Sequence, residues 1–235
     1  MTMTVTPQEI TATLSAWFTA QFTRLEGLAT TLAEELALDS AGRLRVSDAA
    51  RKRMRGHSTA FLAEHALIDG CGLIFSRAAL GTENGQLEWW VREDDARFAR
   101  YSFGVNPSGD RFYDYEQLEW FTRAYESGNQ SLAGPYIDYL GVEDYIVTVT
   151  TPIHVAGTRV GVAGMDIQMT DLETTLVPML RRLDHDTAIL NQHGSILIGS
   201  SGRFLSGDRM ALLPAGYAIS PLEPASAQLA LLHLP

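Results

Sequence analysis

Aromatic rings and carboxylates gather in one part of this sequence, between residues 113 and 166. They come from the segments YDYEQLEWFTRAYESG, GPYID and RVGVAGMDIQM. A cation that enters a protein loses its hydration, and carboxylates and aromatic faces can replace it. The stretch is therefore predicted to line a small-molecule pocket, whose candidate residues are Tyr113, Trp120, Phe121, Tyr136, Asp138 and Asp166.

A purely structural role is the alternative for the same residues. Asp166 would then cap a turn, while Trp120 and Phe121 would belong to the core. A third interpretation uses Asp138 and Asp166 as an acid–base pair of a hydrolase or lyase. The residue types alone leave these three interpretations open.

Two helices are expected before this stretch. Thr6-Pro7-Gln8-Glu9 has a capping hydroxyl, a proline at the first helical position and an acid in the first turn. Apolar residues then recur at three- and four-residue steps as far as Leu36, which predicts one long helix ending near Leu38. Ser47 is the predicted cap of a second helix that continues to about Glu64.

The remaining chain alternates short strands with two further helices. Strands are expected at 66–76 with a bulge at Gly-Cys-Gly, and at 86–91, 98–105, 145–155 and 158–169, the last two joined by Ala156-Gly157. Helices are expected at 115–126 and 171–183, an extended loop starts at Ala133, and shorter strands follow near 187–191, 195–199, 217–220 and 228–233. This order predicts an α+β fold with antiparallel sheets.

Charge and composition exclude several classes of function. A net charge of −10 argues against nucleic acid and anionic lipid as direct partners. The basic cluster of Arg51, Lys52, Arg53 and Arg55 is interpreted as a solvated helix face. The single cysteine, Cys71, lies in an apolar run and is expected to be buried and inert. No metal-binding or phosphate-loop signature is present, so neither a metal nor a cofactor is expected.

Membrane and targeting signals are also missing from the sequence. The first residues lack a basic region followed by an apolar core, and no stretch approaches the roughly 20 apolar residues that span a bilayer. The expectation is a soluble, cytoplasmic protein.

The ordered pattern resembles the double Cache family of ligand-sensing domains. Trp120-Phe121, GPYID, the TVTTPI strand and GVAGMDI carry the resemblance, in that order. It implies a long N-terminal helix, a ligand-binding PAS-like lobe with an antiparallel sheet, and a smaller second PAS-like lobe. The corresponding domains are an N-terminal helical region at 1–65, the ligand-binding lobe at 66–183 and the second lobe at 184–235.

The family's amino-acid site matches this sequence only in part. It is matched by Tyr113, Trp120, Phe121 (where tyrosine is usual), Tyr136, Asp138 and Asp166. Leu118 stands where the family's arginine binds the ligand carboxylate, and Arg123 stands where an acid is usual. Arg123 lies about one helical turn from Trp120, so it is a candidate replacement for that arginine.

A non-enzymatic sensor for a cationic amine-type ligand is therefore the leading prediction. The ligand is an amine, a quaternary ammonium or an amino acid, and the signal passes to a partner protein. The long first helix predicts a homodimer through its apolar stripe, which includes Trp17, Phe18 and Phe22. The alternatives are the hydrolase or lyase that uses Asp138 and Asp166, and a dimeric interaction protein with a vestigial pocket.

Overall fold

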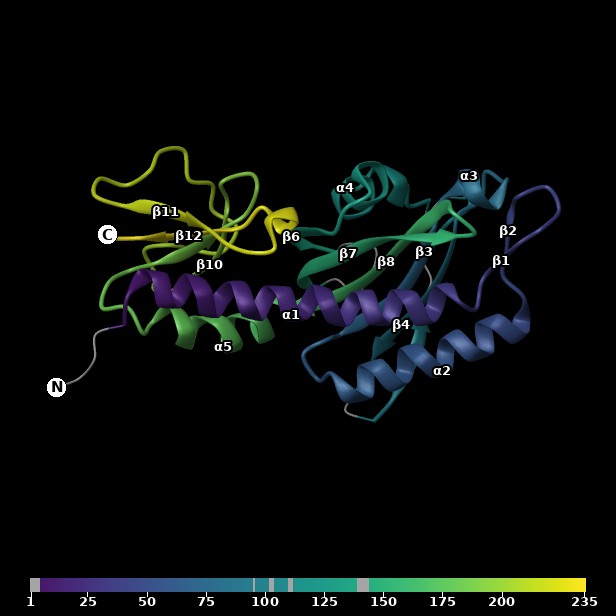
Figure 1. Cartoon of the computed structure of the whole chain (residues 1–235), viewed down its shortest axis with the longest axis horizontal. Coiled ribbons are helices and arrows are strands. Elements are labelled where there is room, and N and C mark those ends of the chain that lie inside the picture. Colours follow the sequence, from purple (N-terminus) through teal and green to yellow (C-terminus); the bar gives the residue numbers. More distant parts are fainter. Residues whose placement is uncertain (1–4, 95, 102–103, 110–111, 139–143) are drawn as a thin grey trace. The chain divides into compact units, whose positions relative to one another are not determined.

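The chain forms two compact units in the computed structural model, which describes residues 5–94, 96–101, 104–109, 112–138 and 144–235. The larger unit comprises Phe22–Ala133 and Ile137–Gln168, and the smaller unit comprises Met1–Gln21, Gly134–Tyr136 and Met169–Pro235. Each unit has its own antiparallel sheet (Figure 1). The mixed α and β content confirms the predicted fold class. The division predicted at residues 65 and 183 stays a prediction.

The first two helices begin where their capping residues predict. Helix α1 spans Pro7–Ala33, and the Thr6 hydroxyl accepts from the Glu9 backbone while Glu9 accepts from the Thr6 backbone at 2.8 Å. Helix α2 spans Asp48–Glu64, with the Ser47 side chain accepting from the Ala50 backbone at 3.1 Å. Helix α1 ends five residues earlier than predicted, because the chain then forms the strand pair β1 (Ala37–Leu38) and β2 (Leu44–Arg45).

A six-stranded sheet in the order β5-β4-β3-β8-β7-β6 is the centre of the larger unit. The predicted hairpin is confirmed, with β7 and β8 paired along their whole length. A one-turn helix α3 (Arg77–Leu80) follows β3, and η1 (Tyr115–Gln117) leads into α4 (Glu119–Ser127). The strands are β3 (Gly70–Phe75), β4 (Gln86–Arg92), β5 (Phe98–Tyr101), β6 (Ser131–Ile137), β7 (Tyr145–Val155) and β8 (Thr158–Gln168).

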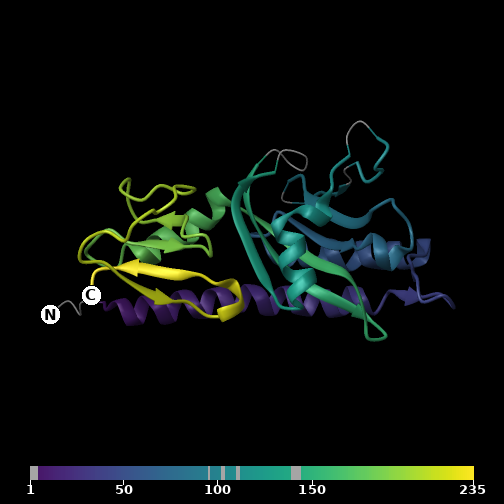
Figure 2. The same ribbon diagram turned by 90° about the horizontal axis from the view of Figure 1, so that it is seen from above.

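The two faces of this sheet carry different helices. Thr150 on β7 donates a hydrogen bond to the Trp120 carbonyl of α4, whereas Cys71 on β3 donates to the Ser58 carbonyl of α2. Because successive side chains of a strand point to opposite faces, these contacts assign α4 and α2 to opposite sides (Figures 1 and 2). Asp166 belongs to the face of α4, because it pairs with Thr148, two residues before Thr150. Cys71 is fully buried as predicted, and burial raises the pKa of its thiol.

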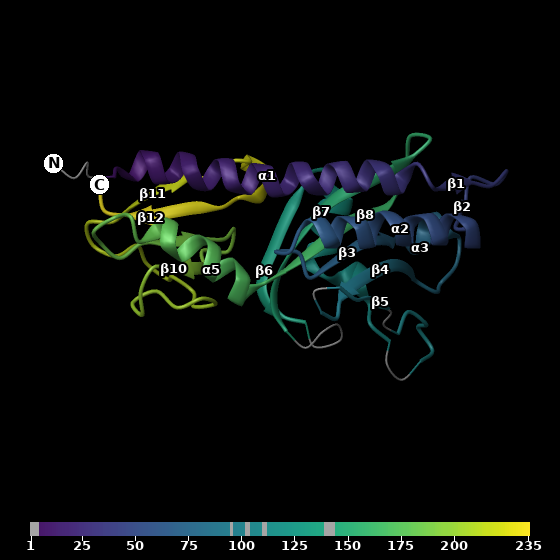
Figure 3. The same ribbon diagram turned by 90° about the horizontal axis from the view of Figure 1, so that it is seen from below.

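The smaller unit contains a four-stranded sheet in the order β10-β9-β12-β11, with α5 on one face (Figure 3). Its buried centre includes Leu190, Phe204, Tyr217 and Leu232. The bounds are α5 (Met169–Leu180), β9 (Ala188–Leu190), β10 (Ile196–Gly199), β11 (Ala218–Pro221), η2 (Ala225–Ala227) and β12 (Ala230–His233).

Several local predictions need correction. The loop expected from Ala133 is part of β6, because its backbone pairs with β7 as an edge strand. The helix expected at 115–126 is split at Leu118, whose extended backbone caps α4. The bulge expected at Gly-Cys-Gly is absent, since β3 keeps continuous register with both neighbours. Residues 102–103 of the strand predicted at 98–105 lie outside the described residues.

The apolar stripe of α1 is covered by the chain itself. Leu14, Phe18, Phe22 and Leu25 are each at most 2% exposed, and Trp17 is partly buried. These side chains contribute to the core and leave no free apolar stripe along the described part of α1. A dimer through this stripe is therefore not supported.

Candidate functional site

Asp166 is a partly buried carboxylate in the middle of the large sheet. It lies on β8, opposite Thr148 of β7 and Gly70 of β3, and Thr148 Oγ1 donates to its Oδ1 at 2.7 Å. Burial raises the pKa of Asp166 to about 8, the Thr148 hydrogen bond opposes this, and the negative charges of Asp138 and Asp69 raise it further. At pH 7 the ligand-free protein therefore holds Asp166 mostly as the neutral acid.

Three of the other predicted residues lie around this carboxylate. The indole of Trp120 hydrogen-bonds the side chain of Tyr113, and the charges of Asp138 and Asp166 both act on the Tyr113 phenol. Burial is the largest cause that raises the pKa of Tyr113, followed by the charge of Asp138. Tyr113, Trp120, Asp138 and Asp166 thus form one group, which we call the carboxylate–aromatic cluster. It brings together residues separated by as many as 53 positions in the sequence.

Local contacts fix the elements that carry this cluster. Trp120 is 6% exposed and its carbonyl accepts from Thr150 Oγ1 at 2.9 Å. The turn after Tyr113 is held by Arg77, which donates to Asp114 and to Glu116 at 2.7 Å each. These bonds connect α4 to the sheet and the turn before it to α3, so Trp120 and Tyr113 are held by the fold before any ligand arrives.

Phe121 lies in an aromatic group next to the cluster. Its ring is 2% exposed, stacks on Tyr125 at 5.1 Å and meets the edge of Tyr115 at 5.4 Å. It also contacts Trp120, with ring centroids 6.1 Å apart. These contacts are typical of a core residue that supports Trp120. Direct contact of Phe121 with a ligand stays a prediction.

Arg123 and Tyr136 are less directly linked to the cluster. Arg123 Nη1 donates to the Leu132 carbonyl at 3.0 Å and to Glu119 at 3.4 Å, so its guanidinium connects α4 with β6. Tyr136 is partly buried on β6 and is grouped with the smaller unit. The ligand contacts of both residues stay predictions.

Sequence reasoning missed three side chains of the same sheet face. Thr148 donates a hydrogen bond to Asp166. Burial is the main cause that raises the pKa of Tyr101, and the negative charge of Asp138 is the second. The indole of Trp89 packs against Gly70 and Gly164. A Cβ added to Gly70 would lie 2.8 Å from the indole, and a Cβ added to Gly164 would lie 3.1 Å from it. Thr148 could be predicted from the alternation of side chains along the paired strands only if the register that places it opposite Asp166 were known.

The indole of Trp89 gives a prediction about this sheet face. Gly164→Ala should force Trp89 to shift and destabilise the protein by about 1–3 kcal/mol, because a methyl group would overpack a filled site. Denaturant unfolding measures this change. Gly27→Ala is the matched control: it lies within α1 with open space at its Cβ and should leave stability unchanged or raise it. Equal stability of Gly164→Ala and the wild type would contradict the placement of Trp89.

The titration of Asp166 gives a second prediction, for the ligand-free protein. Folding raises this pKa from its ordinary 3.8 to about 8, so the folded state binds the proton more tightly than the unfolded state. The free energy of unfolding of the wild type, relative to Asp166→Asn, should therefore fall from about pH 4 to about pH 8 and stay level above. Unfolding curves at pH 5, 7 and 9 measure it, with the exposed Asp184→Asn as control. Parallel profiles of the wild type and Asp166→Asn would contradict the assignment.

Part of this chain matches a family of sensor domains. Residues 61–174 match the family model described as methyl-accepting chemotaxis protein-like, first PDC sensor domain. This range contains all seven predicted site residues. The predicted resemblance to double Cache ligand-sensing domains is confirmed, and so is the prediction of a small-molecule sensor.

Solved structures of chemoreceptor domains share the fold. "Methyl-accepting Chemotaxis protein X" is 16% identical with a TM-score of 0.62, covering 96% of this chain and 94% of its own. The ligand-binding domain of the Pseudomonas aeruginosa PAO1 amino acid chemoreceptor PctC with GABA is 17% identical, with a TM-score of 0.58 and coverages of 95% and 94%. That of the Pseudomonas fluorescens chemoreceptor CtaA with L-isoleucine is 16% identical, with a TM-score of 0.63 and coverages of 96% and 87%.

These comparisons correct the predicted location. The matched domains are periplasmic sensor domains of membrane chemoreceptors, so the prediction of a cytoplasmic protein is wrong. That prediction rested on not finding a signal peptide or a membrane span in the sequence, and such an absence does not locate a protein. Within the described ranges, no helix has the length and apolar character needed to cross a membrane.

Proposed function

We propose that this ligand-sensing domain captures the ammonium group of a small organic molecule at Asp138 and Asp166 and passes the signal to a partner protein. The observation that carries the proposal is the electrostatics of Asp166. Burial, and after it the negative charges of Asp138 and Asp69, raise the pKa of Asp166 and favour its neutral form. A ligand cation would reverse this balance, because an opposite charge nearby favours the ionised carboxylate.

The aromatic side chains support the same ligand chemistry. The charges of both carboxylates act on Tyr113, which Trp120 hydrogen-bonds, and aromatic faces attract cations that have lost water. The structural neighbours are named as complexes with GABA, L-isoleucine and L-Arg, and each of these ligands carries an amino group. We infer that the ammonium group is the part of the ligand that the cluster recognises.

The carboxylate end of an amino acid has weaker support. Leu118 offers no charge, and the Arg123 guanidinium already donates to Leu132 and Glu119. We propose that Arg123 positions β6 and that amines bind at least as well as the amino acids of matching shape. Phe121 is proposed to support Trp120.

Matched ligand pairs test this ranking. Titrations of n-butylamine against GABA, and of 2-methylbutylamine against L-isoleucine, should give equal or tighter binding for the amine in each pair. Arg123→Gln should weaken both members of a pair equally, because its contacts are with the protein. Glu126→Gln, exposed on the same helix, is the control. Binding by the amino acids alone, lost selectively in Arg123→Gln, would show instead that this arginine binds the ligand carboxylate.

A binding role without catalysis is part of the proposal. The alternative acid–base pair of Asp138 and Asp166 would convert the bound ligand, whereas a sensor releases it unchanged. An NMR spectrum of butylamine and GABA after prolonged incubation with the protein separates the two. New ligand signals that disappear in Asp166→Asn would favour the enzyme.

A further inference from the structure

A groove lies in the larger unit, on the sheet face opposite Asp166. Its volume is about 460 Å³, within the range of small-molecule sites. Helix α2 supplies one wall, and strands β4 and β5 supply the other. The lining residues are Arg51, Lys52, Arg55, Glu88, Trp90, Phe98, Ala99 and Arg100.

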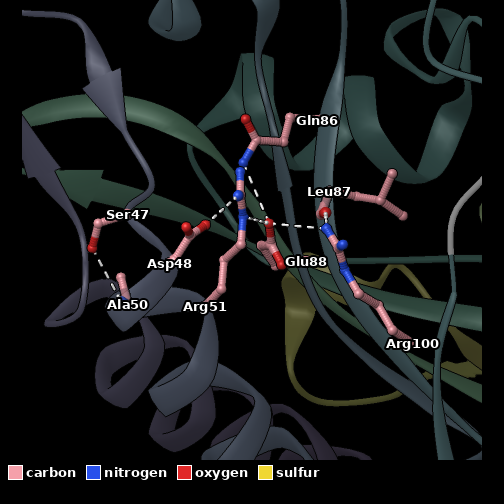
Figure 4. Close-up of polar contacts among 8 residues, drawn as sticks. All are labelled: Ser47, Asp48, Ala50, Arg51, Gln86, Leu87, Glu88 and Arg100. Carbon is pink, nitrogen blue, oxygen red and sulfur yellow. Dashed lines mark hydrogen bonds and ion pairs between the residues drawn. The ribbon is translucent and has the colours of Figure 1, made fainter.

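Glu88 is a fully buried carboxylate at the base of this groove. Its Oε1 accepts from Arg51 Nε at 2.9 Å, Arg100 Nη2 at 3.2 Å and Gln86 Nε2 at 3.3 Å (Figure 4). Its second oxygen, Oε2, is buried and has no hydrogen-bond partner among the described residues. A buried acceptor without a partner is costly, so a donor that reached this oxygen from the groove would gain a hydrogen bond.

Trp90 presents the complementary group. The side chain is 2% exposed, and its indole N–H is also without a partner among the residues that the structure describes. Trp90 lies two residues after Glu88 on β4, so both side chains point to the same face. The groove therefore contains one unused acceptor and one unused donor.

The remaining lining is strongly basic. Arg51, Lys52, Arg55 and Arg100 supply four cations to the lining, against the carboxylate of Glu88 within it and that of Asp48, which pairs with Arg51 at 3.0 Å. Arg51 and Arg100 are partly neutralised by Glu88, whereas Lys52 and Arg55 are exposed on α2. The helix face interpreted as merely solvated is thus one wall of a charged groove.

We propose that this groove binds a small oxyanion that still carries a hydroxyl proton, namely hydrogenphosphate or the singly protonated form of a phosphate monoester, whose second pKa is about 6. A phosphate oxygen accepts from the Trp90 indole, and the phosphate hydroxyl donates to Glu88 Oε2. Lys52 and Arg55 balance the negative charge. Sulfate has the same shape and charge but no proton, so it would place an oxygen against the buried carboxylate of Glu88.

Calorimetric titration at constant ionic strength tests the site with inorganic phosphate and sulfate at pH 7, and with glycerol 3-phosphate at pH 6, where about half of the ester still carries its proton. Phosphate should bind at least about tenfold more tightly than sulfate. The Lys52→Gln/Arg55→Gln double variant should weaken phosphate binding by about tenfold or more. Arg43→Gln/Arg45→Gln removes two exposed cations that pair with Asp39 outside the groove and should leave binding unchanged. Trp90→Phe should weaken phosphate binding several-fold, because it keeps the ring and removes the N–H.

Each outcome decides the proposal. Binding of glycerol 3-phosphate alone or of inorganic phosphate alone supports the site and identifies which source of the phosphate group fits. Equal affinities for phosphate and sulfate, an equal loss in both double variants, or no binding at millimolar phosphate would overturn it. Equal melting temperatures of the two double variants establish that folding is intact. Amine binding at Asp166 should be the same in the two double variants, in Trp90→Phe and in the wild type. A negative result at one proposed site therefore does not affect the other.

Discussion

Replacing Asp166 by asparagine is expected to weaken amine binding by at least about 30-fold while leaving the protein folded. Removing one member of a buried, hydrogen-bonded charge pair costs about 2–5 kcal/mol, and 1.4 kcal/mol corresponds to a tenfold change in affinity. Asparagine keeps the oxygen that accepts from Thr148, and it resembles the neutral acid that Asp166 forms at pH 7. The melting temperature without ligand should therefore be equal to or higher than that of the wild type. Titration calorimetry with n-butylamine measures the affinity.

Two further variants complete this experiment. Asp138→Asn should also weaken binding. The negative charge of Asp138 acts on the Tyr113 phenol and on the Asp166 carboxyl group, so it would also attract a cation bound between them. Asp184→Asn removes an exposed carboxylate elsewhere in the chain and should change nothing. Unchanged affinity in Asp166→Asn would refute an ammonium site at this position, whereas unfolding of that variant would mean that Asp166 has a structural role.

The affinity for an amine should rise with pH by about tenfold per unit below pH 8 and become level above it. An ammonium ligand requires the ionised form of Asp166, and below the pKa of about 8 this form must be made by releasing a proton. The population competent to bind therefore grows with pH until Asp166 is ionised in the free protein. Dissociation constants at pH 6, 7, 8 and 9 measure the profile, because butylamine stays protonated across this range.

The matched control for the pH profile is Asp166→Asn, which has no carboxyl group to titrate at this position. Its residual affinity should be independent of pH between 6 and 8. A wild-type affinity that is also flat over this range would mean that Asp166 is ionised before the ligand binds, in disagreement with its burial beside two other carboxylates.

Local sequence signals predicted elements well where the determinants are local. The Thr6 and Ser47 caps set the starts of α1 and α2, and the Val-, Ile- and Thr-rich runs gave the β7–β8 hairpin. The extent of β6 was not predictable, because an edge strand depends on its pairing with β7 rather than on its own composition. Helix α1 stops at Ala33 because the following residues pair as β1 and β2.

The candidate site was predictable in residue type but not in arrangement. Asp166, Asp138, Trp120 and Tyr113 were found from their order in the sequence, and the structure brings them together. The partner of Asp166, Thr148, required the register of two strands. Trp89 required two glycines on neighbouring strands to leave room for its ring. The buried pair Glu88 and Trp90 could not be separated from ordinary strand residues until their unused polar atoms were visible.

Proton release on ligand binding is the most direct test of the central claim, that a buried and neutral Asp166 ionises to hold an ammonium group. Calorimetric titration with n-butylamine at pH 7, in two buffers of different ionisation enthalpy, counts the protons. The account predicts close to one proton released per ligand by the wild type and none by Asp166→Asn. Tight amine binding by the wild type with no proton released would contradict it.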